Sequence, residues 1–240
     1  MKTTIKFLKA ILVVVLLFIS STTFADTFYV CNGATLSLAP AATPNVTYSW
    51  DVKDLDGTTS LLGYPRAAAP TSLPTTPGTY KVILISTPNA PTVCAPDNVE
   101  NSFVVLPTLS ITLGAPSNAS YCETSSTNTS LITQSTSAVP AGSTSDLEII
   151  YSYMVAKDGG TAVDGTTGGL GSIDGTGKYT LSTLVPGSYV ITGSVRYAQK
   201  TGFTNTFLNS SGTGCAATSG TQTVTVTAKP LKPVITIGAN

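Results

Sequence analysis

Short runs in which apolar and polar residues alternate cover most of the chain after residue 25. Successive side chains of a β-strand point to opposite faces, so this alternation predicts strands with one buried face. Clusters of Pro, Gly, Asn, Asp, Ser and Thr separate the runs, as expected of turns between strands. No stretch after residue 25 keeps a helical period. The pattern therefore predicts an all-β chain built as β-sandwiches.

The same series of landmarks occurs twice, in the same order. Each copy has a cysteine, an aromatic strand, a Pro-Gly turn leading into a tyrosine-containing strand, a second cysteine and a final apolar strand. The two copies are Cys31, Trp50, Tyr80, Cys94 and residues 103–106, then Cys122, Tyr153, Tyr189, Cys215 and residues 224–227. Such a repeat indicates tandem domains. We expect one domain over 26–106, a second over 107–228, and a linker with one further strand over 229–240.

In these motifs the chain resembles the Ig-like and PKD-like repeats of bacterial cell-surface adhesins and of filament (pilus-like) subunits. The resemblance implies an Ig-like sandwich for each domain and a location at the cell surface. Trp50 and Tyr153 then correspond to the core aromatic residue of the third strand. Tyr80 and Tyr189 correspond to the tyrosine corner at the start of the sixth strand.

All four cysteines follow residue 25, and they are predicted to form two disulfides in an oxidising compartment. An antibody domain has a cysteine two residues after its tyrosine corner, but Val82 and Ile191 occupy these positions here. The bridge of the antibody domain is therefore not expected. Instead, the first cysteine of each copy is expected to pair with the second: Cys31 with Cys94, and Cys122 with Cys215.

The first 25 residues have the features of a secretion signal. Lys2, Lys6 and Lys9 precede an apolar run over 10–19, and Ala25 ends a small-residue cleavage site. The apolar run is too short for a stable membrane span. We therefore expect a signal peptide over 1–25, cleavage after Ala25, and a secreted, extracellular protein.

The first copy lacks the opening strand that the second copy has. An alternating run over 109–115 precedes the second copy, whereas only residues 26–30 lie between the expected cleavage site and Cys31. A surplus run of the same type follows the second domain, because Ile-Thr-Ile-Gly-Ala over 235–239 repeats the Ile-Thr-Leu-Gly-Ala of the earlier run. Its residues Val234, Ile235 and Ile237 are the predicted contacts of a donated strand.

The spacing of these runs supports donation of the strand to another molecule. Gly114 lies eight residues before Cys122. A tail that runs on into the mature start of a second molecule would place Gly238 equally far before the Cys31 of that molecule. A head-to-tail contact of this kind propagates as a filament and does not close on itself.

The hypothesis is therefore a fimbrium- or pilus-like homopolymer for cell adhesion, formed by donor-strand exchange. Its partners would be copies of the same chain, with room for an anchor or cap subunit and for a host or neighbouring cell surface. Two alternatives remain open. One is a fragment of a longer multi-repeat adhesin, and the other is a monomeric module that binds carbohydrate or protein.

Composition argues against an enzyme and against binding of nucleic acid. Histidine is absent, which removes the commonest general base, and 12 basic residues balance 12 acidic ones. No cofactor or metal site is predicted.

Asp51, Asp54 and Asp56 fit a hairpin turn better than a calcium loop. The glycine-rich stretch over 156–178 lacks the Lys-Ser/Thr pair of a phosphate loop and is expected to form a long flexible loop.

Overall fold

The computed structural model describes residues 26–94, 96–124, 128–203, 205–208, 215–235 and 237. The predicted signal peptide lies outside the described residues. Strands dominate the described chain, which also contains the short 3-10 helices η1 (Ala141–Ser143) and η2 (Thr167–Gly169). The predicted all-β sandwich fold is confirmed.

The chain divides into two compact units. The described residues of the first unit are 26–28 together with those of Leu36–Thr71 and Gly78–Val104. The second comprises Tyr29–Thr35, Ser72–Pro77 and the residues from Val105 onward. Cys31 therefore belongs to the second unit, although it precedes most of the first unit in sequence.

The strands of the first unit come from a five-stranded sheet with the order β14-β1-β4-β3-β2. The bounds of these strands are β14 (Thr206–Leu208), β1 (Thr27–Cys31), β4 (Val99–Leu106), β3 (Gly78–Pro88) and β2 (Val46–Lys53). Strands β2 and β3 are antiparallel, with Trp50 opposite Leu84 and Val52 opposite Val82. These four side chains share one face of the sheet, because alternate residues of a strand lie on the same side. Trp50, Val52 and Val82 are buried on this face.

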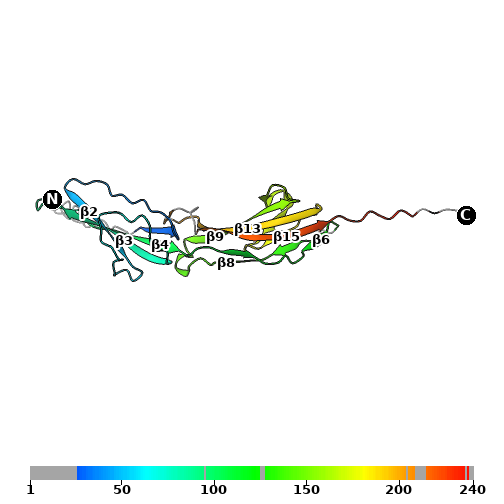
Figure 1. The fold of residues 1–240 in the computed structure, drawn as a ribbon, viewed down its shortest axis with the longest axis horizontal. Coiled ribbons are helices and arrows are strands. Elements are labelled where there is room, and N and C mark those ends of the chain that lie inside the picture. The colour runs from blue at the N-terminus through cyan, green and yellow to red at the C-terminus, as the bar shows by residue number, and fades with distance from the viewer. Residues whose placement is uncertain are drawn as a thin grey trace, which may run out of the picture. The chain divides into compact units, whose positions relative to one another are not determined.

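The second unit contains a sheet with the strand order β10-β9-β13-β15-β6 and smaller sheets with the orders β11-β12-β7 and β5-β8. Figure 1 shows β9, β13 and β15 lying side by side. Strand β13 pairs antiparallel with both of its neighbours, and β6 pairs parallel to the end of β15. The bounds are β5 (Ile111–Leu113), β6 (Ser120–Cys122), β7 (Ser130–Ile132), β8 (Gln134–Thr136), β9 (Leu147–Lys157), β10 (Val163–Asp164), β11 (Gly171–Ile173), β12 (Tyr179–Leu181), β13 (Gly187–Gln199), β14 (Thr206–Leu208) and β15 (Ala216–Thr227).

Tyrosines form much of the core of the second unit. Tyr153 and Tyr179 stack with their ring centroids 4.9 Å apart, and Tyr189 and Tyr197 are also buried. Each hydroxyl donates a hydrogen bond to a backbone carbonyl, at distances of 2.6 to 3.2 Å. A buried tyrosine thus contributes apolar area without leaving its hydroxyl unpaired. The bond from Tyr189 to Val185, four residues upstream, has the form of a tyrosine corner.

The glycine-rich stretch is not the long loop expected from its composition. It contains β10, η2 and β11, and it is held by the bonds from Tyr179 to the Gly165 carbonyl and from Tyr153 to the Gly177 carbonyl. Glycine is also needed where the stretch passes the Tyr151 ring, because a Cβ at Gly177 would come within 2.5 Å of that ring. The glycines therefore permit close packing against aromatic side chains.

Candidate functional site

An apolar segment with no regular secondary structure follows β15, and we call it the tail; its described residues are 228–235 and 237 (Figure 1). Its large apolar side chains are almost fully exposed: Leu231 94%, Val234 91%, Ile235 83% and Ile237 90%. Single exposed apolar residues are ordinary, but several within one short segment indicate an interaction surface. The described part of the chain leaves the tail uncovered.

The tail leaves the second unit from a fixed point. At the end of β15, the Glu123 amide donates to the Thr227 carbonyl at 3.0 Å. The Lys229 amide donates in turn to the Glu123 carboxylate at 2.9 Å. Pro230 and Pro233 follow, and proline fixes φ and favours an extended chain. The segment is thus anchored at its base and biased toward the extended conformation that a strand requires.

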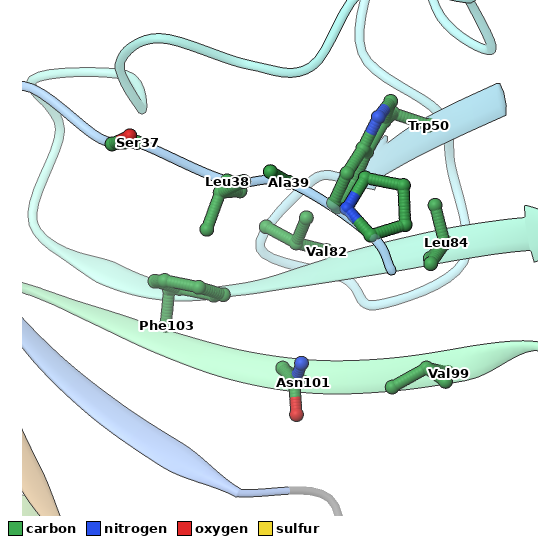
Figure 2. A pocket seen from close by; sticks show the side chains of 10 residues that line it. Ser37, Leu38, Ala39, Trp50, Val82, Leu84, Val99, Asn101 and Phe103 are labelled. Atoms are coloured by element: carbon green, nitrogen blue, oxygen red, sulfur yellow. The ribbon is translucent and has the colours of Figure 1, made fainter. Parts of the chain in front are cut away.

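The first unit contains an apolar groove, which we define by its ten lining residues. Figure 2 shows the segment 37–40 passing over one face of the sheet. The cavity between them has a volume of about 310 Å³. It is lined by Ser37, Leu38, Ala39, Pro40, Trp50, Val82, Leu84, Val99, Asn101 and Phe103, none of which carries a charge.

The burial of the lining changes along the groove. Phe103 and Val82 are buried and form the closed part, and Phe103 also stacks on Phe28 with the ring centroids 5.0 Å apart. Leu38 and Leu84 are half-buried, and Val99, at the start of β4, is 41% exposed. The groove is therefore apolar at its floor and accessible where β4 begins.

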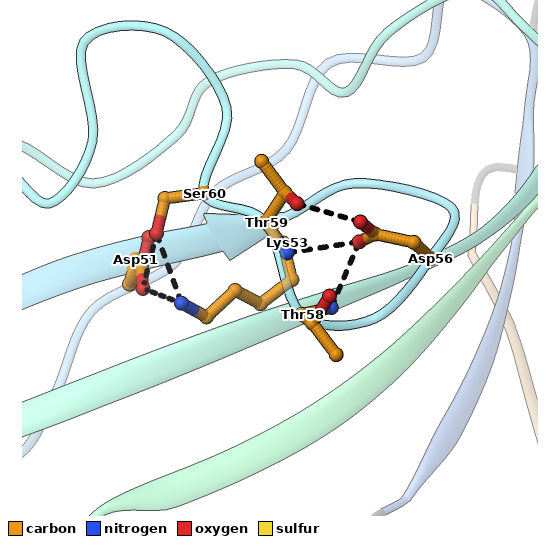
Figure 3. Close-up of polar contacts among 6 residues, drawn as sticks. All are labelled: Asp51, Lys53, Asp56, Thr58, Thr59 and Ser60. Carbon is orange, nitrogen blue, oxygen red and sulfur yellow. Dashed lines mark hydrogen bonds and ion pairs between the residues drawn. The ribbon is translucent and has the colours of Figure 1, made fainter.

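Asp56, which follows β2, organises a turn, whereas Asp51 lies within the strand (Figure 3). The Asp56 carboxylate accepts hydrogen bonds from the Thr58 amide and from the amide and hydroxyl of Thr59. Asp51 instead forms an ion pair with Lys53 at 2.8 Å and accepts a bond from Ser60. Within the residues that the structure describes, no group of three or more His, Cys, Asp or Glu side chains could hold a metal ion.

The predicted cysteine pairing is wrong. The structure joins Cys31 to Cys215, which are 184 positions apart in sequence, with a Cα–Cα distance of 5.1 Å. Both residues belong to the second unit, so the last residues of β1 are tied to the start of β15. Cys94 and Cys122 are free thiols, the first exposed and the second half-buried. A hydrogen bond from the Thr124 hydroxyl lowers the pKa of the Cys122 thiol below its usual value.

A buried polar cluster also ties β1 into the second unit, and the sequence patterns did not reveal it. The Tyr29 hydroxyl donates to Asp146 Oδ2 at 2.6 Å, and Asn205 Nδ2 donates to the same oxygen at 2.7 Å. Ser145 donates to the other carboxylate oxygen. Burial alone would raise the pKa of Asp146, but these hydrogen bonds outweigh it and lower the pKa. Burial, together with Asp146, raises the pKa of Tyr29 to about 12.

Replacing Tyr29 with Phe is expected to lower the free energy of unfolding by about 2 kcal/mol at pH 7, because a hydrogen bond to a charged group is lost. Because the pKa of Asp146 is lowered on folding, its stabilisation is present above the ordinary value of 3.8 and is lost as the pH falls through the folded value. The effect of Tyr29→Phe should therefore shrink below pH 3.8. Urea unfolding followed by circular dichroism at several pH values measures both effects.

Tyr48→Phe is the matched control, since the Tyr48 hydroxyl donates at 2.8 Å to the neutral Thr43 hydroxyl. Its cost should be about 1 kcal/mol and should not depend on pH in this range. Equal pH profiles for the two variants would contradict the assignment of a charged Asp146 at this site.

The structure leaves the predicted donor residues and the predicted core residues in different surroundings. Val234, Ile235 and Ile237 lie in the uncovered tail, whereas Trp50, Tyr80, Tyr153 and Tyr189 are buried.

The segment 37–40, which lines the groove, was not predicted from the sequence as part of a site. The alternation of Ala34, Leu36 and Leu38 was the signal that could have identified it.

Several solved structures resemble the chain at low similarity. The fibronectin(III)-like modules of Clostridium thermocellum CbhA are 14% identical, with a TM-score of 0.35 over 90% of this chain and 98% of theirs. The N-terminal four Ig domains of Dscam1 are 12% identical, with a TM-score of 0.29 over 87% of this chain and 45% of theirs. Drosophila N-cadherin EC1-4 is 12% identical, with a TM-score of 0.31 over 86% of this chain and 48% of its own. The chain thus spans just under half of the Dscam1 and N-cadherin chains.

No protein-family model matches the chain, and no curated protein sequence matches it. Among the described residues, no helix has both the length and the apolar character needed to cross a membrane.

Proposed function

We propose that the protein is a structural subunit of an extracellular bacterial surface filament. In this filament, the tail of one molecule adds a β-strand to the first unit of the next molecule. The single observation that carries the proposal is the exposure of Leu231, Val234, Ile235 and Ile237 in a segment anchored at its base. An extended apolar segment that its own chain leaves uncovered is suited to strand addition.

The physical gain lies in burying the tail. Each large aliphatic side chain that moves from water into an apolar site contributes about 1.5 to 3 kcal/mol. Strand addition also pairs the backbone groups of the tail, which otherwise face water. Because donor and acceptor lie on different parts of the molecule, each bound copy presents a new tail, and the contact propagates.

The extracellular location is part of the same proposal. The Cys31–Cys215 disulfide supports it, since such bonds persist in oxidising compartments. The predicted signal peptide over 1–25 supplies a route out of the cell. Adhesion to a host or neighbouring cell surface, and an anchor or cap subunit at the filament ends, would complete such an assembly.

The test compares the secreted protein with a variant carrying Val234→Ser, Ile235→Ser and Ile237→Ser. The unchanged protein is expected to form concentration-dependent polymers, seen by light scattering and electron microscopy. The variant should remain monomeric, with polymerisation weakened by at least about a thousandfold, since three apolar side chains are lost. Its thermal midpoint should not change, because the tail is uncovered in its own chain.

Lys232→Ser is the matched control, since it alters the same segment without removing an apolar side chain. It should polymerise like the unchanged protein. Polymers of normal length from the triple variant would refute strand donation. A monodisperse unchanged protein that binds glycans would favour the monomeric binding module.

A further inference from the structure

We infer that the apolar groove of the first unit, beneath the segment 37–40, is the acceptor site for the tail of a second copy. The inference rests on the proposed function and adds the location of the site and the residues that form it. Three properties of the described residues lead to this site: the chemistry of the lining, the size of the cavity, and the backbone of the segment that covers it.

The chemistry of the groove matches that of the tail. The groove lining carries no charged side chain, and it offers the aliphatic or aromatic faces of Leu38, Trp50, Val82, Leu84 and Phe103. In an extended chain, Ile235 and Ile237 lie on the same side, because alternate residues of a strand share a face. This pair presents to the groove a surface as apolar as its floor.

The size of the groove suits such a pair. An apolar cavity of about 150 Å³ accommodates a benzene molecule. The groove, at about 310 Å³, therefore accommodates two branched aliphatic side chains. Access is from the start of β4, where the side chain of Val99 is 41% exposed.

The backbone over the groove is available for pairing. The Leu36 amide donates to the Thr71 carbonyl at 2.8 Å. Beyond this bond, the segment 37–40 belongs to no strand and makes no backbone–backbone hydrogen bond with any residue that the structure describes. The amides of Ser37, Leu38 and Ala39 and the carbonyls of the segment are thus available beside an apolar cavity, which is the arrangement that an added strand uses.

A tail from a second copy is the occupant that fits these observations. The apolar side chains of the tail are exposed, and its prolines favour an extended chain. Among its described residues, only Lys229 and Lys232 are charged. An uncharged groove opposes the docking of such a segment less than it opposes a charged peptide.

Trp50 provides a direct test, because it is the single tryptophan of the chain and lines the groove. The receptor is the secreted protein with serine at positions 234, 235 and 237, and the ligand is a synthetic peptide of residues 229–240. A saturable change in tryptophan fluorescence is expected on titration. The same peptide with the three serines should produce no change.

Val99→Asp in the receptor places a charge at the open end of the groove. It should weaken peptide binding at least tenfold and leave the thermal midpoint unchanged, because Val99 is already partly exposed. Val163→Asp in β10 of the second unit is the matched control. Val163 is 45% exposed and lies outside the groove, so binding should be unaffected.

The outcomes separate this inference from the proposed function. If the unchanged protein polymerises but the peptide leaves Trp50 fluorescence unaltered, or if Val99→Asp polymerises normally, the groove is not the acceptor. Strand donation would then remain supported, with an acceptor site elsewhere in the first unit. If the unchanged protein does not polymerise and the peptide does not bind, both the filament and the groove are refuted.

Discussion

Replacing both Cys31 and Cys215 with serine is expected to lower the free energy of unfolding of the second unit by about 5 kcal/mol. In the chain-entropy model, a disulfide stabilises by restricting the unfolded chain, and the effect grows with the loop that it closes. The separation of 184 positions between these cysteines makes this an unusually large loop. Urea unfolding followed by far-UV circular dichroism measures the loss.

The control for this prediction is the double variant Cys94→Ser with Cys122→Ser. Both of these thiols are free, one exposed and one half-buried, so their replacement should change the free energy of unfolding by less than about 0.5 kcal/mol. If the two double variants lose the same free energy of unfolding, the loss comes from replacing cysteine and not from removing the Cys31–Cys215 bridge. That result would contradict the prediction. Mass spectrometry of the unreduced protein identifies the linked pair directly.

Replacing Tyr179 with Ala is expected to destabilise the second unit by about 4 kcal/mol, the usual cost of removing a buried aromatic ring. The ring stacks on Tyr153 at 4.9 Å and is fully buried. Its hydroxyl also donates a hydrogen bond of 2.8 Å to the Gly165 carbonyl. The change therefore leaves a cavity and releases the glycine-rich stretch, and thermal or urea unfolding reports the combined cost.

Tyr179→Phe separates the two contributions, because it keeps the ring and removes only the hydroxyl. The Gly165 carbonyl then loses its partner, at a cost of about 1.5 kcal/mol. Hydrogen exchange of amides over 160–177 should rise more in Tyr179→Ala than in Tyr179→Phe. Equal exchange in both would mean that the hydroxyl, and not the packing of the ring, orders this stretch.

The glycine-rich stretch shows why composition alone gave the wrong expectation there. Many glycines with few apolar residues are typical of a flexible loop. The residues that order the stretch lie outside it: Tyr151 and Tyr153 on β9 before it, and Tyr179 on β12 directly after it. Local composition cannot report a contact with a ring that arrives from another strand.

The cysteines show the same limit. The repeat predicted an oxidised protein but assigned each bridge within one copy. The structure instead places the end of β1 in the second unit, beside the start of β15. The hydrogen bond from Tyr29 to Asp146 also joins the end of β1 to the second unit, at the residue before β9. Which cysteines form a disulfide depends on which unit each segment of the chain belongs to. The order of the sequence motifs does not predict that assignment.

The sequence by itself determined the all-β character of this protein, through residues that alternate with a period of two along each strand. It also predicted a surplus strand that contains Val234, Ile235 and Ile237. Only the tertiary structure decided that the described residues of this segment lie uncovered and form no strand, that Cys31 pairs with Cys215, and that the segment 37–40 lies over a groove containing Trp50. Periodicity is a local property of the chain and can be read locally. Grooves and bridges are formed by residues distant in sequence, whose meeting depends on the packing of the whole fold.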